Sequence, residues 1–488
     1  MTSLTRPELR RELRPARFRW YFFLAGFLIL PNLPLLLAGH SLNLLLSGYI
    51  DLDYLVIGLL SLFLPRAATF FLLLSAIVFD FIHAACATYL FSPSEFINSM
   101  RFGDMLSTTR IGTIAGALCL VVLICLLATA CTTRYTAEKQ RHIAIGVVLI
   151  LLLILPLLQI GATRRVFAGR EDDLAAITLV RMPVLSLIHR QRTYDRYERG
   201  ERLASAFAMP SATALALNHL RDGSKSAGHG GLPNFVQILV ESWGYANDEA
   251  LRNALLAPYT DPVLLAKYEV LEGTMPFEGP TTSGEARELC QSHLGFNASH
   301  GSVEQMQHCL PMRLRGLGFE TLAVHGFKGE MFDRQTWYPE MGFQDIRFED
   351  RLHAQGLPDC PGPFPGTCDA SVAAWLSERL AQPQASPLFV HWVTLNSHLP
   401  LLEPALLKDP VSCTVSLATR NKAQICSWYQ LEYVVHNAVR EMAMKPLSRP
   451  TIFVIVGDHA PPFDLQGIRG QFSSLDVPYV ILLPKEGG

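Results

Sequence analysis

An aspartate and a histidine follow directly on a strongly apolar segment near the C-terminus. Residues 451–457 read Thr-Ile-Phe-Val-Ile-Val-Gly, and Asp458 and His459 come next. Such a run predicts a buried strand, and open α/β sheets keep their active sites at the carboxyl ends of strands. A carboxylate and an imidazole together suit Zn²⁺ or Mn²⁺. Taken alone, a buried and hydrogen-bonded Asp–His pair without a metal is the commoner case, so the other strand ends carry the argument.

A carboxylate occupies the same kind of position after a second apolar segment. Residues 235–240 read Phe-Val-Gln-Ile-Leu-Val, and Glu241 follows them. Parallel strands of one sheet end at the same edge, so Glu241 is a candidate third ligand. The alternative is a glutamate with a turn or capping role.

Three adjacent hydroxyl residues, Thr281, Thr282 and Ser283, begin a predicted helix. Thr282 and Glu285 have the spacing of a capping box, which explains them equally well. Both uses are compatible, because a hydroxyl at a helix N-terminus faces unpaired N–H groups and the positive end of the dipole. That position favours phosphate binding, and a nearby metal would activate the hydroxyl as a nucleophile.

Two further strand ends carry histidines. His325 ends the apolar segment 319–325, and Arg334 follows nine residues later with a guanidinium suited to phosphate oxygens. A surface loop with a salt bridge is the alternative. His398 follows the segment 388–395 and could protonate a leaving oxygen. His391 lies inside that segment and is predicted to be a packed core residue.

These strand ends need one sheet to hold them together. Apolar and helical patterns alternate from residue 233 onward, which predicts an α/β domain with a mostly parallel central sheet. The expected strands are 235–241, 319–325, 388–395, 451–457 and 477–484, and the expected helices are 284–292, 303–316, 371–382 and 424–444. We place this domain at 233–488, which is long enough for one substantial core.

The apolar residues, 50% of the chain, are concentrated before residue 163, whereas the net charge of −2 gives no indication of nucleic-acid binding. A helix needs about 20 apolar residues to cross a bilayer. On that basis we predict an all-α transmembrane bundle of about five helices in residues 1–162, the second of them short. The expected spans are 20–39, 52–65, 68–91, 111–131 and 143–162.

Basic residues orient this bundle. Six arginines precede the first span, and the 132–142 loop is also basic, whereas the 40–51 loop has no Lys or Arg. The positive-inside rule puts the N-terminal segment and the 132–142 loop on the cytoplasmic side. An odd number of spans then leaves the 233–488 domain outside the cytoplasm. Residues 163–232 are predicted to be a juxtamembrane helix and a linker.

Six of the ten cysteines lie in the 233–488 domain, and an even number suits an oxidising compartment. Our interpretation pairs neighbours along the chain, as Cys290–Cys309, Cys360–Cys368 and Cys413–Cys426, although six cysteines allow 15 connectivities. A zinc cluster is the alternative, but the chain has no C-x₂-C pair.

The order of these features resembles the alkaline phosphatase superfamily. More narrowly, it resembles the membrane-anchored, sulfatase-like phosphotransferases: lipoteichoic acid synthases, phosphoglycerol transferases and phosphoethanolamine transferases. The residues that carry the resemblance are Val240-Glu241-Ser242-Trp243-Gly244, Thr282-Ser283-Gly284-Glu285, His325-Gly326, Phe332-Asp333-Arg334, Gly342-Phe343, Asn396-Ser397-His398 and Gly457-Asp458-His459.

The resemblance implies one divalent metal, Zn²⁺ or Mn²⁺, held by Glu241, Thr282, Asp458 and His459. It implies that Thr282, or otherwise Ser283, becomes phosphorylated during transfer of a phosphoglycerol or phosphoethanolamine head group. The ligands of the substrate would be His325, Arg334 and His398, with His398 also acting in catalysis.

The resemblance further implies a phospholipid donor and a glycan or lipid acceptor. It places the protein in the bacterial inner membrane as a multi-pass protein, with its catalytic domain in the periplasm.

Three alternatives remain. The first is a hydrolase, either a sulfatase or a phosphodiesterase, in which water replaces the acceptor. Cys309-Leu310-Pro311-Met312-Arg313 matches the C-x-P-x-R pattern of sulfatases with an oxidised cysteine, and we interpret the match as coincidence. The second is a scaffold that has lost activity. The third is a transporter, which the few ionisable residues of the spans, such as Asp80 and His83, do not favour.

Overall fold

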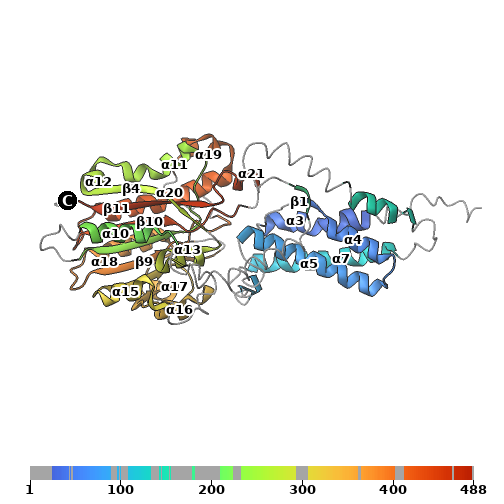
Figure 1. The fold of residues 1–488 in the computed structure, drawn as a ribbon, viewed down its shortest axis with the longest axis horizontal. Coiled ribbons are helices and arrows are strands. Elements are labelled where there is room, and N and C mark those ends of the chain that lie inside the picture. The colour runs from blue at the N-terminus through green and yellow to red at the C-terminus, as the bar shows by residue number, and fades with distance from the viewer. Residues whose placement is uncertain are drawn as a thin grey trace, which may run out of the picture. The chain divides into compact units, whose positions relative to one another are not determined.

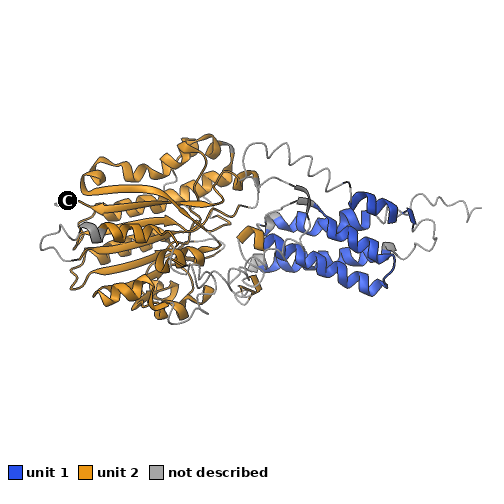
Figure 2. Cartoon of the chain, in the orientation of Figure 1, with its two compact units in different colours: residues 1–85, 108–190 blue, residues 86–107, 191–488 orange. Residues whose placement is uncertain are grey.

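The structure is a computed structural model in which the chain divides into two compact units (Figure 2). One unit comprises residues 1–85 and 108–190, and the other comprises 86–107 and 191–488. Each unit is described by itself. The described residues are 25–42, 44, 48–89, 96–97, 99–100, 108–132, 142–143, 145–152, 154, 178–181, 209–223, 232–277, 279–292, 306–360, 364–401, 411–463 and 466–485.

The described part of the N-terminal unit is mainly helical. Its helices pack through a small buried apolar cluster that includes Phe27, Leu55, Leu73 and Ile124. A short parallel pair of strands joins segments far apart in the sequence. The elements are η2 (Ala25–Ile29), η3 (Leu30–Asn32), α3 (Leu33–Ser41), β1 (Gly48–Asp51), α4 (Leu52–Ser61), α5 (Arg66–Tyr89), α7 (Thr108–Thr132) and β2 (Thr178–Arg181).

Two of the described helices are long and apolar enough to cross a membrane by length and composition. They cover Arg66–Tyr89 and Ile111–Ala130, where two of the five spans were expected. The predicted 52–65 span is a helix of only ten residues, because Asp51 caps its N-terminus and it ends at Ser61. The 20–39 span is described from residue 25, and most of the 143–162 span lies outside the described residues. A five-helix bundle is therefore not confirmed.

The second unit contains a seven-stranded sheet in the order β4-β11-β10-β3-β9-β5-β6 (Figure 1). The five strands from β10 to β6 run parallel, whereas β11 is antiparallel to β10 and to β4. The predicted α/β domain with a mostly parallel sheet is confirmed. The strands are β3 (Asn234–Val240), β4 (Tyr268–Pro276), β5 (Glu320–His325), β6 (Asp345–Arg347), β9 (Leu388–Val393), β10 (Thr451–Gly457) and β11 (Asp476–Pro484).

The five predicted strands are present, but β4 and β6 were missed. These two strands form the edges of the sheet. Most positions of β4 are exposed or half-buried, and β6 has only three residues. Neither therefore has the continuous apolar run that marks the buried strands.

Helices and a two-stranded ribbon complete this unit. The predicted helix 284–292 begins earlier, at Thr281, and the described part of the predicted helix 303–316 forms α15 only from Leu310. The elements are α10 (Ala212–Gly223), α11 (Glu249–Leu256), η6 (Ala257–Thr260), α12 (Pro262–Lys267), α13 (Thr281–Cys290), α15 (Leu310–Gly316), η8 (Met331–Asp333), α16 (Arg334–Glu340), α17 (Glu349–His353), β7 (Asp359–Cys360), β8 (Gly366–Thr367), α18 (Asp369–Ala381), η10 (Cys413–Val415), α19 (Leu417–Asn421), α20 (Ala423–Met444) and α21 (Gln466–Arg469).

Part of the predicted connector belongs to this core. Residues 212–223 form α10, which packs against β10 and β11. Ala212 and Ala216 are fully buried there, because small side chains on one helix face allow close approach to the sheet. In the first half of the connector the structure describes residues 178–181, which form a strand rather than the predicted helix.

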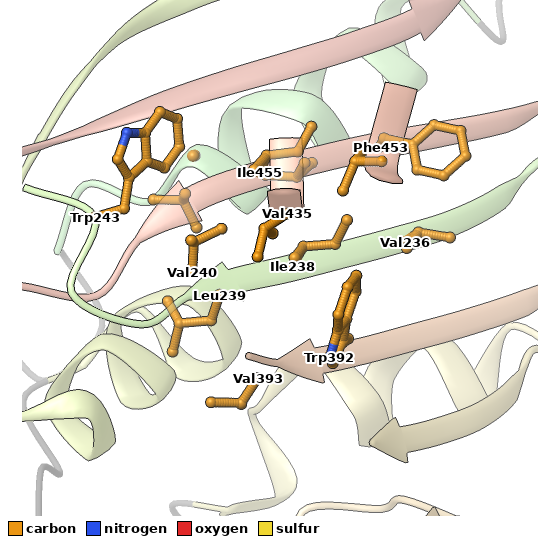
Figure 3. Packing of buried hydrophobic residues seen from close by; sticks show 14 of the residues in the cluster. Val236, Ile238, Leu239, Val240, Trp243, Trp392, Val393, Val435, Phe453 and Ile455 are labelled. Atoms are coloured by element: carbon orange, nitrogen blue, oxygen red, sulfur yellow. The ribbon is translucent and has the colours of Figure 1, made fainter. Parts of the chain in front are cut away.

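The core around the central strands is continuous (Figure 3). Every residue of β3, β9 and β10 is buried, as expected for parallel strands covered on both faces. Val435 of α20 lies in the same cluster as Ile238 of β3 and Ile455 of β10. A rigid, fully buried sheet centre therefore supports the strand ends.

Three disulfides link Cys290 to Cys309, Cys360 to Cys368 and Cys413 to Cys426, which confirms the predicted pairing. Cys309 is also fully buried. A cysteine held in a buried disulfide is not available for oxidation to formylglycine, so the structure supports reading the C-x-P-x-R match as coincidence.

We expect removal of a disulfide to destabilise this unit more, the longer the loop that the disulfide closes. The sequence separations are 19, 13 and 8 residues, and longer loops lose more unfolded-state entropy when closed. Replacing Cys290 and Cys309 together with alanine should cost about 3 kcal/mol, and Cys360 with Cys368 slightly less. Urea unfolding followed by tryptophan fluorescence measures both, and an inverted order would contradict the loop-entropy account.

Candidate active site

The register between β3 and β10 brings two distant carboxylates together. Gly457 pairs with Val240 in this parallel ladder, so Asp458 and Glu241 are the residues that directly follow the last paired positions of the two neighbouring strands. Adjacent strands lie about 4.8 Å apart. Gly457 permits this packing, because a Cβ atom there would overlap the carbonyl oxygen of Trp243. The predicted ligands Glu241 and Asp458 therefore meet because of strand pairing.

Ser242 holds both carboxylates, and sequence reasoning gave it no role. Its amide donates to Asp458 Oδ1 at 2.7 Å, and its hydroxyl donates to Glu241 Oε1 at 2.9 Å. Its φ of 61° lies in the left-handed region, where a serine is strained. The indole Nε1 of Trp428 donates to the Ser242 carbonyl at 2.9 Å and helps to fix this turn. The only signal in the sequence was a serine directly after the candidate ligand.

His459 completes a cluster of three possible metal ligands. One ligand atom from each of Glu241, Asp458 and His459 lies within 4.8 Å of the others, and all three residues are buried. His459 Nδ1 donates to the carbonyl of Ala460 at 3.0 Å. Its Nε2 then lies 3.3 Å from Asp458 Oδ2 and 3.7 Å from Glu241 Oε1. A neutral imidazole would place its lone pair against two carboxylates, so this arrangement needs a cation or a proton.

The pKa shifts of the two carboxylates also indicate that the cluster needs a cation or a proton. Burial and the neighbouring Glu241 raise the pKa of Asp458 to about 7. Burial opposes ionisation of Glu241, but His398, His459 and two hydroxyl donors hold the pKa of Glu241 below its usual value. Asp458 Oδ2 accepts no hydrogen bond from any described residue. An orphaned buried oxygen, a second carboxylate and an oriented imidazole fit a divalent cation well.

The hydroxyl beside this cluster belongs to Thr281 rather than to the predicted Thr282. Thr281 Oγ1 donates to Glu241 Oε2 at 3.0 Å. The Thr282 hydroxyl is buried and has no hydrogen-bond partner among the described residues, and Ser283 is half-buried. Successive helical residues point about 100° apart. Because α13 already begins at Thr281, only that side chain faces Glu241.

The predicted capping box is absent. Pro280 is the N-cap of α13, and no side chain caps the helix. Gly284 lets the first turn of α13 approach the loop after β10, since a Cβ atom there would lie 3.1 Å from the Cα of Asp458. Close packing against the Asp458 loop, rather than a capping box, sets the start of this helix.

Two more predicted histidines line a pocket beside the cluster. His325 Nδ1 donates to the Val393 carbonyl at 3.1 Å, and His398 Nδ1 donates to the Leu399 carbonyl at 2.7 Å. Both rings are thereby oriented through the same nitrogen as His459. Burial and the positive charge of Arg334 lower the pKa of His325 to about 3, so His325 is neutral near pH 7. The polar lining residues include Glu241, Thr281, His325, Arg334, His398 and His459, and the apolar ones include Phe327, Met331, Phe332, Phe364 and Leu395.

Arg334 lines the same pocket but is not a free anion receptor. Its Nε and Nη2 donate to the carboxylate of Glu285 at 3.0 to 3.2 Å, and both side chains are buried. Glu285 was predicted to cap a helix. It instead faces the protein interior and also accepts a hydrogen bond from the Tyr338 hydroxyl. Arg334, the candidate ligand of the substrate, is therefore already paired with the Glu285 carboxylate.

The prediction that His391 is a core histidine is confirmed. His391 is fully buried, its ring stacks on Phe343, and its Nδ1 contacts Gln237. Its Nε2 lies 3.5 Å from Glu285. His391 thus belongs to the packing behind the pocket, because it lies inside β9, whereas His398 follows that strand.

Another buried histidine should make the protein sensitive to acid. His436 of α20 is fully buried, its Nδ1 lies 2.9 Å from the Tyr259 hydroxyl, and its ring packs against Trp243. Burial lowers the pKa of His436 to about 3. Between about pH 6.5 and pH 3 the unfolded chain binds a proton that the folded chain does not, so stability falls as pH falls through this window.

We therefore expect His436→Gln to weaken this dependence. The wild type should lose about 2 kcal/mol more than the variant between about pH 7 and pH 5. Urea unfolding followed by tryptophan fluorescence at both pH values measures the difference. Equal losses in both proteins would show that His436 does not contribute.

A curated protein of Rhizobium meliloti (strain 1021), named for the modification of cyclic beta-1,2-glucan, is 24% identical over 258 residues, which represent 48% of this chain and 37% of that protein. This chain therefore spans little more than a third of the length of that relative.

Two solved structures match part of this chain with TM-scores below 0.5. The Streptococcus pyogenes phosphoglycerol transferase GacH, in complex with sn-glycerol-1-phosphate, matches with a TM-score of 0.37 and 15% identity, over 56% of this chain and 78% of that chain. A protein in the alkaline phosphatase superfamily from Vibrio parahaemolyticus matches with a TM-score of 0.38 and 16% identity, over 53% of this chain and 62% of that chain.

The family assignment rests on a broader match. The sequence model described as Sulfatase matches residues 233–487, which is more than half of the chain. This segment contains the sheet, the Glu241–Asp458–His459 cluster and the pocket described above. The chain belongs to the sulfatase family.

Proposed function

We propose that this protein transfers a phospholipid head group to a glycan or lipid acceptor through a phosphorylated Thr281. The observation that carries this proposal is the position of Thr281 Oγ1, which lies 3.0 Å from Glu241 Oε2 at the N-terminus of α13. A hydroxyl, a carboxylate–imidazole cluster and oriented histidines line one pocket. This set suits nucleophilic attack on phosphorus.

A divalent metal, Zn²⁺ or Mn²⁺, fits the site for the reasons given above. Glu241, Asp458 and His459 would hold it, with the Thr281 oxygen as a fourth donor. When bound, such an ion lowers the pKa of a ligated hydroxyl and withdraws charge from phosphoryl oxygens. The mixed nitrogen and oxygen donors suit both Zn²⁺ and Mn²⁺.

The reaction would proceed in two displacements. Thr281 Oγ forms a bond to phosphorus while the bond from phosphorus to the diacylglycerol oxygen breaks, and the hydroxyl proton of Thr281 ends on that oxygen. We assign His398 to pass this proton, because it lines the same pocket as Thr281 and an imidazole suits proton transfer near neutral pH. An acceptor hydroxyl then attacks phosphorus, the Thr281 Oγ–P bond breaks, and Thr281 regains a proton.

The charges in the pocket favour phosphoglycerol over phosphoethanolamine. Among the described residues that line the pocket, Glu241 is the only carboxylate, and it belongs to the cluster. An ammonium group would therefore find no carboxylate of its own, which makes its burial costly. Glycerol hydroxyls can instead use the Arg334 guanidinium and the imidazole nitrogens as partners.

A glycan acceptor and a membrane location fit the remaining observations. The curated relative is named for the modification of a cyclic glucan. Three disulfides in the catalytic unit suit an oxidising compartment outside the cytoplasm. Two helices long enough to cross a bilayer would keep the active site near a lipid donor. We therefore propose a multi-pass inner-membrane protein with a periplasmic catalytic unit, the orientation that the basic loops predict.

The test is product analysis with purified full-length protein. We expect the protein, supplied with phosphatidylglycerol, Mn²⁺ or Zn²⁺ and an oligosaccharide, to release diacylglycerol and to form a phosphoglycerol-modified glycan. Mass spectrometry identifies both products. Release of free glycerol phosphate at the same rate with and without acceptor would indicate a phosphodiesterase, and no turnover of any phospholipid would contradict the proposal.

A further inference from the structure

Glu285 connects three elements that carry the site. It lies on α13 one turn after Thr281, and its carboxylate accepts hydrogen bonds from Arg334 and Tyr338 of α16. His391 of β9 lies against it, and β9 leads to the loop of His398. Glu285 is fully buried, and Arg334 holds its pKa at about 2 against the opposing effect of burial. Glu285 therefore faces Arg334 as a carboxylate near pH 7.

The charge of Arg334 is cancelled before any substrate binds. Its Nε and Nη2 point to Glu285, whereas Nη1 has no hydrogen bond to any described residue. Arg334 lines the pocket and its guanidinium lies 5.3 Å from the Phe332 ring. A ligand therefore meets a hydrogen-bond donor that belongs to a pair with no net charge.

We propose that Glu285 sets the charge specificity of this pocket, so that it accepts singly charged phosphodiesters and discriminates against doubly charged phosphomonoesters. This inference rests on the proposed function and deepens it. Glu285 acts through Arg334 and is a positioning residue rather than a catalytic one. The preference also suits the reaction, because a phospholipid head group is joined through a phosphodiester.

The expected effect follows from Coulomb's law. A phosphodiester carries one negative charge, whereas a monoester carries nearly two above about pH 7. One uncompensated positive charge at about 6 Å from the extra negative charge, with an effective dielectric constant of about 20, corresponds to roughly a hundredfold difference in binding. Solvent in the pocket reduces this, and we expect a change of at least about tenfold.

A purely structural role for Glu285 predicts something else. Removing one partner of a buried ion pair destabilises the fold, and that loss would lower the activity on every substrate together. The ratio of activities on the two ester types would not move. The ratio is therefore the measurement that separates charge tuning from structural support.

The experiment uses the full-length protein with bis(4-nitrophenyl) phosphate as the diester and 4-nitrophenyl phosphate as the monoester. The readout is the ratio of kcat/KM for the diester to kcat/KM for the monoester. Glu285→Gln should lower this ratio at least about tenfold, because it leaves Arg334 with a net positive charge. The double variant Glu285→Gln with Arg334→Gln should return the ratio to near the wild-type value.

The matched control is Glu288→Gln. Glu288 lies on the same helix, is equally buried and pairs with Arg287 at 2.7 Å, and neither residue lines the pocket. We expect this variant to change both activities in parallel. An unchanged ratio in Glu285→Gln, or an equal shift in Glu288→Gln, would overturn the proposal.

Binding to the wild type provides a test that needs no variant. At about pH 8 calorimetry should show that dimethyl phosphate, a monoanion, binds at least as tightly as inorganic phosphate, which is mostly a dianion. Tighter binding of inorganic phosphate would overturn the inference even if Glu285→Gln fails to fold. If the wild type binds dimethyl phosphate in this way but turns over no phospholipid, the proposed function fails and the charge preference stands.

Discussion

Replacing Thr281 with alanine should lower head-group transfer by a factor of about 10³ or more, because the bond to phosphorus can no longer form. Thr281 Oγ1 is the hydroxyl that contacts Glu241 Oε2. Transfer is measured as diacylglycerol released from phosphatidylglycerol. Peptide mass spectrometry of protein stopped during turnover should find the phosphoglycerol group on Thr281 in the wild type and nowhere in the variant.

Thr282→Ala is the matched control, since it removes the neighbouring hydroxyl of the same helix. The Thr282 hydroxyl is buried without a partner among the described residues, so its loss should be nearly neutral or slightly stabilising. We expect this variant to keep most of its activity. An active Thr281→Ala protein beside an inactive Thr282→Ala protein would move the nucleophile to the position that the sequence alone favoured.

Asp458→Asn should abolish metal binding and reduce transfer at least about 10²-fold. The substitution removes a negative charge from a cluster in which Asp458 Oδ2 and His459 Nε2 are 3.3 Å apart. Metal content after dialysis measures binding directly. Thermal unfolding gives a second readout, because a metal at about 100 times its Kd should stabilise the wild type by about 2.7 kcal/mol and leave the variant unaffected.

Asp369→Asn is the control for burying an altered carboxylate. Asp369 is also buried and accepts the backbone N–H groups of Leu395 and Asn396, but it lies outside the Glu241–Asp458–His459 cluster. This variant should keep the metal content of the wild type. Retention of metal by Asp458→Asn, with wild-type affinity, would contradict the assignment of the cluster as a metal site.

Several features of this protein could be predicted from local sequence patterns. The runs before Glu241, His398 and Asp458 are mostly apolar, and every residue of the strands that they form is buried, which is typical of strands covered on both faces. Parallel pairing then brings strand ends to one edge whatever lies between them in the sequence. The neighbouring cysteines also paired as expected.

Local sequence patterns could not predict which hydroxyl contacts Glu241. Three adjacent residues offered one, and a shift of one residue in the start of a helix turns the side chains by about 100°. The helix begins at Thr281, where Pro280 precedes it and Gly284 packs against the Asp458 loop. That packing is a tertiary contact, and the capping-box spacing of Thr282 and Glu285 does not indicate that the Thr281 hydroxyl contacts Glu241.

Sequence by itself determined which kinds of side chain follow the buried strands. The apolar runs that mark those strands, and the chemistry of the hydroxyl and imidazole groups after them, are local properties of the sequence. Only the tertiary structure decided which atoms meet. Arg334 and Glu285 are 49 positions apart, and Ser242 and Asp458 are 216 apart. Such pairs form because burial makes an unpartnered charge or N–H group costly, so each finds whichever partner the fold brings near.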